Sequence, residues 1–274
     1  MQLISYIGER GERAGMIDGD EVVDVGASVR ELIGADGGLA AIDTGGDCLA
    51  LAEVELRPPI PDPEKIICVG LNYRSHAAEA GMEPPQSPTF FGKYRNALWP
   101  AGRAVVLPEA SSKVDFEAEV AFVVGRRAKA VEAEVALDHV AGYTLLNDLS
   151  ARDLQFETPQ WMPGKVFDGS APFGPALVTP DEAGPHDAIE IALDLNGERM
   201  QGASTSDLIF SVPELLARLS RLMTLEPGDV IATGTPSGVG STRDPRVWLA
   251  PGDRIEISSP TLGRLETEIA PSAG

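Results

Sequence analysis

The stretch VDFEAEVAFVVG, residues 114–125, alternates with a period of two and constrains the fold more than any other part of the chain. Successive side chains of a strand point to opposite faces, so Asp115, Glu117 and Glu119 share one face. Further along the stretch, the same face becomes apolar. The pattern therefore predicts a strand that runs into the interior and carries carboxylates toward it.

Glu117 and Glu119 lie two positions apart, which in a strand separates them by about 7 Å. At an effective dielectric constant of about 20, like charges at that distance repel by roughly 2 kcal/mol. A buried pair therefore requires a proton or a cation, and both Mg²⁺ and Ca²⁺ bind carboxylate oxygens. Acids also line many solvated strand faces, so the strand alone leaves a metal site and an ordinary polar face open.

A third acid, Asp148 in TLLNDLSARDLQ, stands where an apolar strand gives way to polar residues. Ending a strand or capping a helix is a common use of aspartate. Arg152 and Gln155 follow four and seven residues later. A helix here would place all three side chains on one face.

His76 in GLNYRSHAAEAG is followed three positions later by Glu79. On a helical turn such a pair can hydrogen-bond, which orients the imidazole as a general base near neutral pH. A surface histidine with an incidental acidic neighbour is the alternative. His139 and His186 lack a comparable setting.

Two further stretches carry candidate site residues. Lys165 in MPGKVFDGSAPFGP follows a Pro-Gly turn, where its ammonium could meet a carboxylate or an enolate, or simply be solvated. The loop TGTPSGVG, 233–240, could hold an anion with its backbone donors. It lacks the GK[ST] ending of a nucleotide-binding loop, and the chain has no HExxH or GxSxG motif.

Turn signals between short apolar runs favour strands over helices. The chain contains 29 glycines and 22 prolines, and Asp18-Gly19 and Asn196-Gly197 each predict a hairpin. The segment 130–142 has a helical composition with Gly142 beyond its end, and Ser211 with Glu214 predicts a capping box. We expect a mixed β-rich α+β fold.

A proline cluster, RPPIPDPEK, can continue neither a helix nor a strand and marks a boundary. We expect a small N-terminal β domain at 1–58, with Ser28 capping a short helix, and a catalytic domain at 59–274. The chain has no apolar run near the ~20 residues that span a bilayer.

Charge and cysteine content limit partners and location. Forty-two acids against 22 lysines and arginines give a formal net charge of −20. This balance argues against nucleic acid and anionic membrane as partners, because phosphates require cationic patches. Two cysteines without a CxxC motif, and no secretory leader, predict a reduced cytoplasmic protein.

Five stretches together resemble the fumarylacetoacetate hydrolase family, in its bacterial two-domain type. They are VGLNYRSHAAE, DFEAEVAFVVG, NDLSARDLQ, GKVFDGSAPFGP and IATGTPSGVG, which occur in the family's order and approximate spacing over most of 64–270. The resemblance implies the family's C-terminal β fold, a homodimer and a small-molecule 2-oxo acid substrate.

The resemblance also implies roles for individual residues. Mg²⁺ or Mn²⁺, with Ca²⁺ as a further possibility, would be held by Glu117, Glu119 and Asp148 plus water. A dyad of His76 and Glu79 would lie on a lid that orders when substrate arrives. Lys165 would be catalytic, and the residues facing the substrate would be Arg152, Gln155 and Thr235. Asp115 would lie at the solvent end of its strand or support the site from behind.

The implied reaction is metal-dependent hydrolysis of a C–C bond in a 2,4-dioxo acid of acylpyruvate or fumarylpyruvate type, in aromatic or sugar-acid catabolism. The metal and Lys165 would stabilise an enolate, and His76 would activate water. Relatives decarboxylate oxaloacetate or isomerise 2-hydroxyhepta-2,4-diene-1,7-dioate, so both remain alternatives. A non-catalytic protein whose acids hold a structural cation is an alternative of another class.

Overall fold

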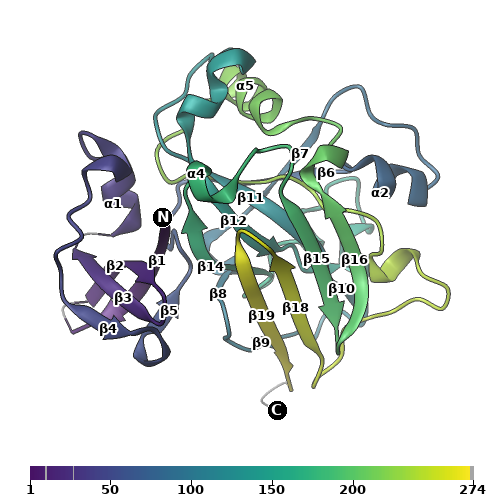
Figure 1. Cartoon of the computed structure of the whole chain (residues 1–274). Coiled ribbons are helices and arrows are strands. Elements are labelled where there is room, and N and C mark those ends of the chain that lie inside the picture. Colours follow the sequence, from purple (N-terminus) through teal and green to yellow (C-terminus); the bar gives the residue numbers. More distant parts are fainter. Residues whose placement is uncertain (10, 27, 272–274) are drawn as a thin grey trace.

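A long, strongly curved sheet organises the molecule (Figure 1). The computed structural model describes residues 1–9, 11–26 and 28–271 of the chain. Its strand order is β4-β3-β2-β1-β14-β12-β11-β17-β6-β7, with β5 beside β1 and β8 beside β14. A five-stranded sheet in the order β16-β15-β18-β19-β9 packs against strands β11, β12 and β14 (Figure 1). The predicted mixed, β-rich α+β fold is confirmed.

The strands and helices have the following bounds. The strands are β1 Gln2–Gly8, β2 Gly11–Asp18, β3 Glu21–Gly26, β4 Cys48–Ala50, β5 Glu55–Arg57, β6 Ile66–Gly70, β7 Thr89–Lys93, β8 Leu98–Pro100, β9 Val105–Val106, β10 Val114–Asp115, β11 Ala118–Val124, β12 Val140–Asn147, β13 Ser150–Ala151, β14 Ala171–Val178, β15 Glu190–Leu195, β16 Glu198–Ser204, β17 Val230–Ala232, β18 Arg254–Ser259 and β19 Gly263–Ala270. The α-helices are α1 Val29–Gly34, α2 Arg74–Glu79, α3 Arg152–Gln155, α4 Pro180–Ala183 and α5 Val212–Leu222. Short 3₁₀ turns are η1 Gly38–Ala41, η2 Leu51–Glu53, η3 Arg95–Ala97, η4 Ala133–His139, η5 Met162–Gly164, η6 Thr205–Asp207 and η7 Gly240–Thr242.

Both predicted hairpins form where the turn residues require them. Strands β2 and β3 pair across the turn after Asp18, and β15 and β16 pair across Asn196 and Gly197. These last two residues have φ angles of 54° and 82°, the left-handed region that Asn and Gly tolerate best. Turn chemistry readable in the sequence therefore sets the register of two strand pairs.

The predicted helix caps are also present. Ser28 and Glu31 form a capping box at α1, and Ser211 and Glu214 form one at α5. In each box a serine side chain accepts from the backbone of the first turn, and the glutamate reaches back to the N-cap backbone. Helix α5 buries its apolar face, including Leu215.

The helix predicted for 130–142 is wrong. Residues Ala133–His139 form the 3₁₀ turn η4, and the chain then enters β12, so Gly142 lies inside a strand rather than beyond a helix. A β-carbon at position 142 would lie 2.4 Å from the carbonyl oxygen of Val178. The glycine is therefore explained by the close approach of β14, which helical composition does not reveal.

The predicted alternation of 114–124 is present, although the strand is divided into β10 and β11 by Phe116 and Glu117. Even-numbered side chains such as Phe122 join the core between the two sheets. Ala121 and Val123, which share a face with Glu119, join the core on the other side of the long sheet. Every residue of β11 is buried, and Asp115, Glu117 and Glu119 are all buried, so the acids of this stretch enter the interior as expected.

The N-terminal segment continues the long sheet, because β1 pairs with β14 and places Leu3 opposite Leu177 (Figure 1). Strand β5 ends at Arg57, directly before the proline cluster. The division of the chain after residue 58 stays a prediction.

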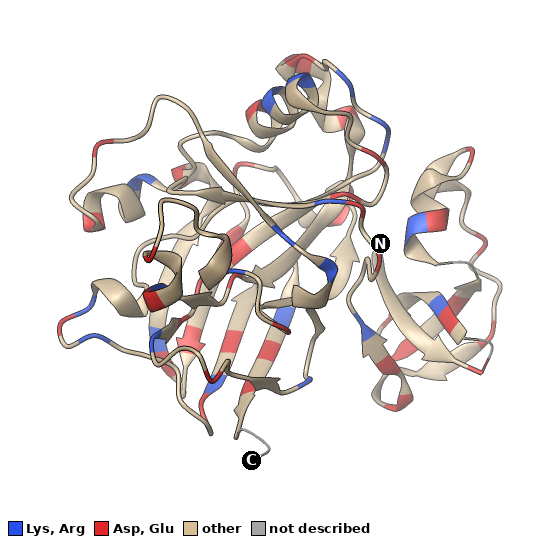
Figure 2. Cartoon of the chain, turned by 180° about the vertical axis from the view of Figure 1, so that it is seen from behind, with Lys and Arg blue, Asp and Glu red and all other residues tan. Residues whose placement is uncertain are grey.

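Acidic residues are spread over loops, helices and strands in both the N-terminal segment and the rest of the chain (Figure 2). Among the described residues, no helix combines the length and apolar character needed to cross a membrane.

Candidate functional site

Three carboxylates meet where β11 and β12 lie side by side. Glu117 precedes β11, Glu119 lies in it, and Asp148 directly follows β12, whose Asn147 pairs with Ala118. One carboxylate oxygen from each of the three acids lies within 4.8 Å of the others, and all three residues are buried. The structure therefore brings Asp148 to Glu119 and Glu117, which precede it by 29 and 31 positions in the sequence.

The break in the strand before β11 is held by side chains instead of a regular ladder. The backbone N–H of Glu117 donates to Oδ1 of Asn147 at 3.1 Å, and that of Asp148 donates to the Glu117 carbonyl at 2.9 Å. The Ala118 N–H donates to Oε1 of Gln201 at 2.9 Å. These contacts satisfy buried donors and fix the backbone that aims the acids.

Two buried lysines compensate the acids. Nζ of Lys165 lies 2.8 Å from Glu117 and 2.7 Å from Asp148, and Nζ of Lys93 lies 2.7 Å from the other Asp148 oxygen. Asp148 and Glu117 outweigh burial and raise the pKa of Lys165, so it stays charged. Sequence reasoning missed Lys93, although a lysine that ends the apolar strand β7 was a visible signal.

Arg152 forms a second buried ion cluster beside the first. Its Nη2 lies 2.8 Å from Asp115 and 2.6 Å from Glu117, and its Nη1 donates to Oε1 of Gln155 at 2.9 Å. Asp115 is fully buried, so a place at the solvent end of its strand is wrong. The alternative, support from behind the site, agrees with these contacts.

Glu117 and Glu119 differ in charge environment. Burial favours the neutral form of both, but Arg152 and Lys165 outweigh it at Glu117 and bring its pKa to about 2. At Glu119, burial together with Asp148 and Glu117 raises the pKa well above its usual value. Among the described residues, no ammonium or guanidinium contacts Glu119, which accepts from the Gly234 N–H at 2.8 Å.

The donor set fits a hard divalent cation. Three carboxylates with converging oxygens suit Mg²⁺, Mn²⁺ or Ca²⁺, which prefer oxygen ligands. Glu119 adds a specific reason, because it faces two other acids and lacks a cation of its own. A bound metal would relieve this repulsion.

His76 and Glu79 form the predicted pair on α2. Nδ1 of His76 lies 3.0 Å from Oε2 of Glu79, and the other Glu79 oxygen accepts from the Gly238 N–H at 2.8 Å. Burial raises the pKa of Glu79, but the bonds from His76 and Gly238 outweigh it and hold the pKa below its usual value. The carboxylate thus orients the imidazole and ties α2 to the loop 233–240.

Thr235 lies in that loop and is held by a residue absent from the sequence analysis. Its Oγ1 accepts from Nε2 of Gln201 at 2.8 Å, and the same nitrogen donates to the Pro236 carbonyl at 2.9 Å. Gln201 therefore links the loop to β11 through Ala118. One glutamine within the strand ERMQGAS offered no signal of this role.

A cavity of about 330 Å³ unites these groups. It is lined by Val69, Gly70, Leu71, His76, Ala80, Met82, Pro85, Thr89, Phe91, Glu117, Glu119, Arg152, Gln155, Phe156, Trp161, Lys165, Thr235, Ser241 and Thr242. Of the predicted site residues, Asp148 and Glu79 stand behind the lining and contact residues within it. The arrangement can bind a small oxygen-rich molecule beside a cation site and a general base.

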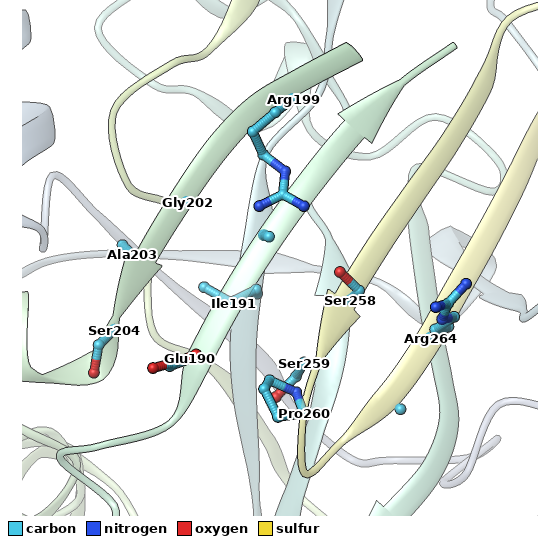
Figure 3. A pocket seen from close by; sticks show the side chains of 12 residues that line it. Glu190, Ile191, Arg199, Gly202, Ala203, Ser204, Ser258, Ser259, Pro260 and Arg264 are labelled. Carbon is cyan, nitrogen blue, oxygen red and sulfur yellow. The ribbon is translucent and has the colours of Figure 1, made fainter. Parts of the chain in front are cut away.

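A separate hollow of about 690 Å³ lies on the outer face of the five-stranded sheet (Figure 3). Glu190, Arg199 and Arg264 supply its charged side chains, and Arg199 pairs with Asp194. These groups are largely exposed, and the acidic cluster lies elsewhere. The smaller cavity is therefore the candidate site.

Comparison with known proteins shows which family the chain is similar to. The family model described as fumarylacetoacetate (FAA) hydrolase C-terminal matches residues 65–270. The oxaloacetate tautomerase YisK of Bacillus subtilis is 43% identical over 231 residues, 83% of this chain and 77% of that protein.

Two solved structures are similar over nearly the whole chain. A 2-hydroxyhepta-2,4-diene-1,7-dioate isomerase from Mycobacterium marinum has a TM-score of 0.85 and 31% identity, covering all of both chains. A maleylpyruvate hydrolase from Sphingobium has a TM-score of 0.82 and 32% identity, covering 99% of this chain and all of that one.

Proposed function

The chain belongs to the fumarylacetoacetate hydrolase family, and on that premise we propose that it is a metal-dependent hydrolase that cleaves a C–C bond in a 2,4-dioxo acid. Three of the proteins found by comparison are named as an oxaloacetate tautomerase, a 2-hydroxyhepta-2,4-diene-1,7-dioate isomerase and a maleylpyruvate hydrolase. The observation that carries the proposal is one cavity that joins the Glu117, Glu119 and Asp148 cluster to the His76–Glu79 pair.

The proposed cation is Mg²⁺ or Mn²⁺, held by Glu117, Glu119 and Asp148. When bound, it would supply Lewis-acid stabilisation of negative charge on the oxygens of a 2-oxo acid. The ammonium of Lys165 would stabilise the same negative charge on the substrate oxygens. This ammonium has three N–H donors, and the contacts to Glu117 and Asp148 leave one for the substrate.

Hydrolysis needs a base for water, and His76 takes this role in the proposal. The imidazole, oriented by Glu79, accepts a proton from water while the water oxygen attacks C4 of the 2,4-dioxo acid. The C3–C4 bond then breaks, its electron pair leaves as the enolate of pyruvate, and the proton returns to C3. The products are pyruvate and a carboxylic acid. Arg152, Gln155 and Thr235 would orient the substrate.

Replacement of Glu79 by Gln tests this role. We expect Glu79→Gln to lower kcat for acylpyruvate hydrolysis by about 100-fold, because the imidazole loses its orienting carboxylate. Bound Mn²⁺, measured by electron paramagnetic resonance, should be unchanged. Glu83→Gln, an exposed acid beyond α2, is the matched control. Hydrolysis that persists in Glu79→Gln with metal bound would reject the dyad.

A second candidate is proton transfer at C3 of a 2-oxo acid, as in a tautomerase or isomerase, or decarboxylation of oxaloacetate. The name of the Bacillus subtilis relative favours the tautomerase. Decay of enol-oxaloacetate absorbance, release of CO₂ and release of pyruvate from acylpyruvates distinguish the three reactions. If enol decay is fast and no acylpyruvate is cleaved, the tautomerase replaces the hydrolase.

The proposal extends to a cytoplasmic homodimer. Cys48 and Cys68 are both free, which agrees with a reducing compartment. Light scattering should return twice the mass of the chain.

A further inference from the structure

The cavity has two chemically different regions. Its charged and ionisable lining comprises His76, Glu117, Glu119, Arg152 and Lys165. The remaining lining comprises Gly70, the uncharged polar residues Thr89, Gln155, Thr235, Ser241 and Thr242, and eight apolar residues that form the apolar wall: Val69, Leu71, Ala80, Met82, Pro85, Phe91, Phe156 and Trp161. A substrate whose oxo acid group occupies the charged region must place the rest of its length against this apolar wall.

The apolar wall begins directly beside the charged groups. Nζ of Lys165 lies 4.9 Å from the centroid of the Phe91 ring, and the Phe91 and Trp161 rings meet edge to face with centroids 5.6 Å apart. The Trp161 ring also lies on the backbone of Gly70, where a β-carbon would come within 2.2 Å of Cζ3. A glycine at position 70 thus makes room for the indole, which continues the surface that starts at Phe91.

The cations that line the cavity lie in its charged region, where they contact the acidic cluster. Arg152 contacts Asp115 and Glu117, and Lys165 contacts Glu117 and Asp148. The remaining ionisable donor is His76, whose Nδ1 is held by Glu79. Within the described lining, no further lysine or arginine faces Phe91 or Trp161.

A second carboxylate placed along this wall would lose hydration without gaining a cation. Transfer of an ionised carboxylate from water to an apolar surface without a cation is strongly unfavourable. Transfer of an alkyl or aryl group from water to the same surface is favourable. We infer that the substrate is a monocarboxylic 2,4-dioxo acid whose acyl group is apolar and packs against Phe91 and Trp161. This inference rests on the proposed function, and it assigns Trp161 as a residue that determines specificity.

Two acids of equal length test the inference directly. Butanoylpyruvate (2,4-dioxoheptanoate) ends in a methyl group where succinylpyruvate (2,4-dioxoheptanedioate) ends in a carboxylate. We expect calorimetric titration with Mg²⁺ present to give a Kd about tenfold or more lower for butanoylpyruvate. The Glu79→Gln variant, which should turn these acids over about 100-fold more slowly than wild type, is titrated so that turnover contributes little to the measured heat. Equal binding, or tighter binding of succinylpyruvate, would overturn the inference.

Variants of Trp161 test whether the apolar wall causes the preference for butanoylpyruvate. Trp161→Arg supplies a cation, so the preference for butanoylpyruvate should shrink by about tenfold. Trp161→Phe keeps an apolar ring and should retain most of the preference for butanoylpyruvate over succinylpyruvate. Leu222→Ala, at an exposed position that ends α5, should behave like wild type. A preference that Trp161→Arg leaves unchanged would remove Trp161 from the recognition of the acyl group.

Binding and turnover separate the two proposals. If wild type binds butanoylpyruvate preferentially but releases no pyruvate from it, the hydrolase is wrong and the apolar subsite stands. If both acids are cleaved with equal kcat/KM and bind equally, the hydrolase stands and the apolar subsite is wrong.

Discussion

Asp115 joins the guanidinium of Arg152 to the turn at Gly240 and Ser241, whose N–H groups donate to its two oxygens at 2.7 and 3.1 Å. Ser241 lines the cavity and Arg152 contacts Glu117. One buried acid therefore sets the position of two cavity residues and of a candidate metal ligand. Its contribution is positional, because it stands behind the lining.

We expect Asp115→Asn to lower the free energy of unfolding by about 3 kcal/mol, because breaking a buried ion pair leaves a charge without compensation. Asp194→Asn is the matched control, since Asp194 pairs with Arg199 at the surface and such pairs contribute under about 1 kcal/mol. Urea denaturation measures both. Similar losses in the two variants would contradict the importance of burial here.

Replacement of Glu119 tests whether this residue is a ligand of the proposed cation. We expect Mn²⁺ at about 100 times its Kd to stabilise wild type by roughly 2.7 kcal/mol. The same Mn²⁺ should not stabilise Glu119→Gln, which loses a ligand from the cluster. Thermal unfolding with and without metal measures this difference.

Glu198→Gln, at an exposed position in β16, should respond like wild type. The alternative of a purely structural cation predicts a large loss of melting temperature on chelation and no turnover of any oxo acid. An increase in melting temperature on Mn²⁺ addition that Glu119→Gln retains would reject Glu119 as a ligand.

At the scale of elements, the first hairpins are held together by one polar cluster. Asp24 of β3 accepts from Tyr6 of β1 at 2.5 Å and from Arg13 of β2 at 2.6 Å. The bonds from Arg13 outweigh burial and lower the pKa of Asp24 from 3.8 to about 2. A lowered pKa in the folded state means that the ionised form stabilises the fold.

The sign of the pH dependence follows from that shift. The contribution of Asp24 is complete above about pH 4 and is lost as the pH falls toward 2. We expect Asp24→Asn to reduce the free energy of unfolding by roughly 2 kcal/mol at pH 7, and by progressively less below pH 4. Urea titrations at several pH values measure the difference in free energy of unfolding between wild type and Asp24→Asn. Asp36→Asn, at an exposed position, is the control. A difference that does not depend on pH would contradict this account.

At the scale of the whole molecule, the net charge of −20 opposes the approach of an anionic substrate. Salt screens long-range repulsion with a Debye length of about 10 Å at 0.1 M. We therefore expect kcat/KM for an acylpyruvate to rise between about 0.02 and 0.2 M NaCl, while kcat changes little. Stopped-flow kinetics measures both parameters. A fall in kcat/KM would show that Arg152 and Lys165 dominate the field that the substrate meets.

Local signals determined much of the fold without any tertiary information. Turn residues at Asn196 and Gly197, and capping residues at Ser28 and Ser211, act on their own neighbours, so their effects can be read from sequence. The helix predicted through Gly142 failed because a contact with β14, more than 30 positions away, decided the conformation.

The candidate site divides in the same way. Period-two alternation in 114–125 and the acid at the end of β12 were visible in the sequence, because side-chain direction follows from the pleat. Lys93, Gln201 and the burial of Asp115 were decided only by the tertiary structure, since each acts through partners distant in the chain. The apolar wall at Trp161 also exists only after folding, when β6, β7 and the segment after α3 meet around one cavity. Sequence determines which groups are available, whereas packing of distant segments determines which of them share a desolvated space, and that shared space sets the chemistry.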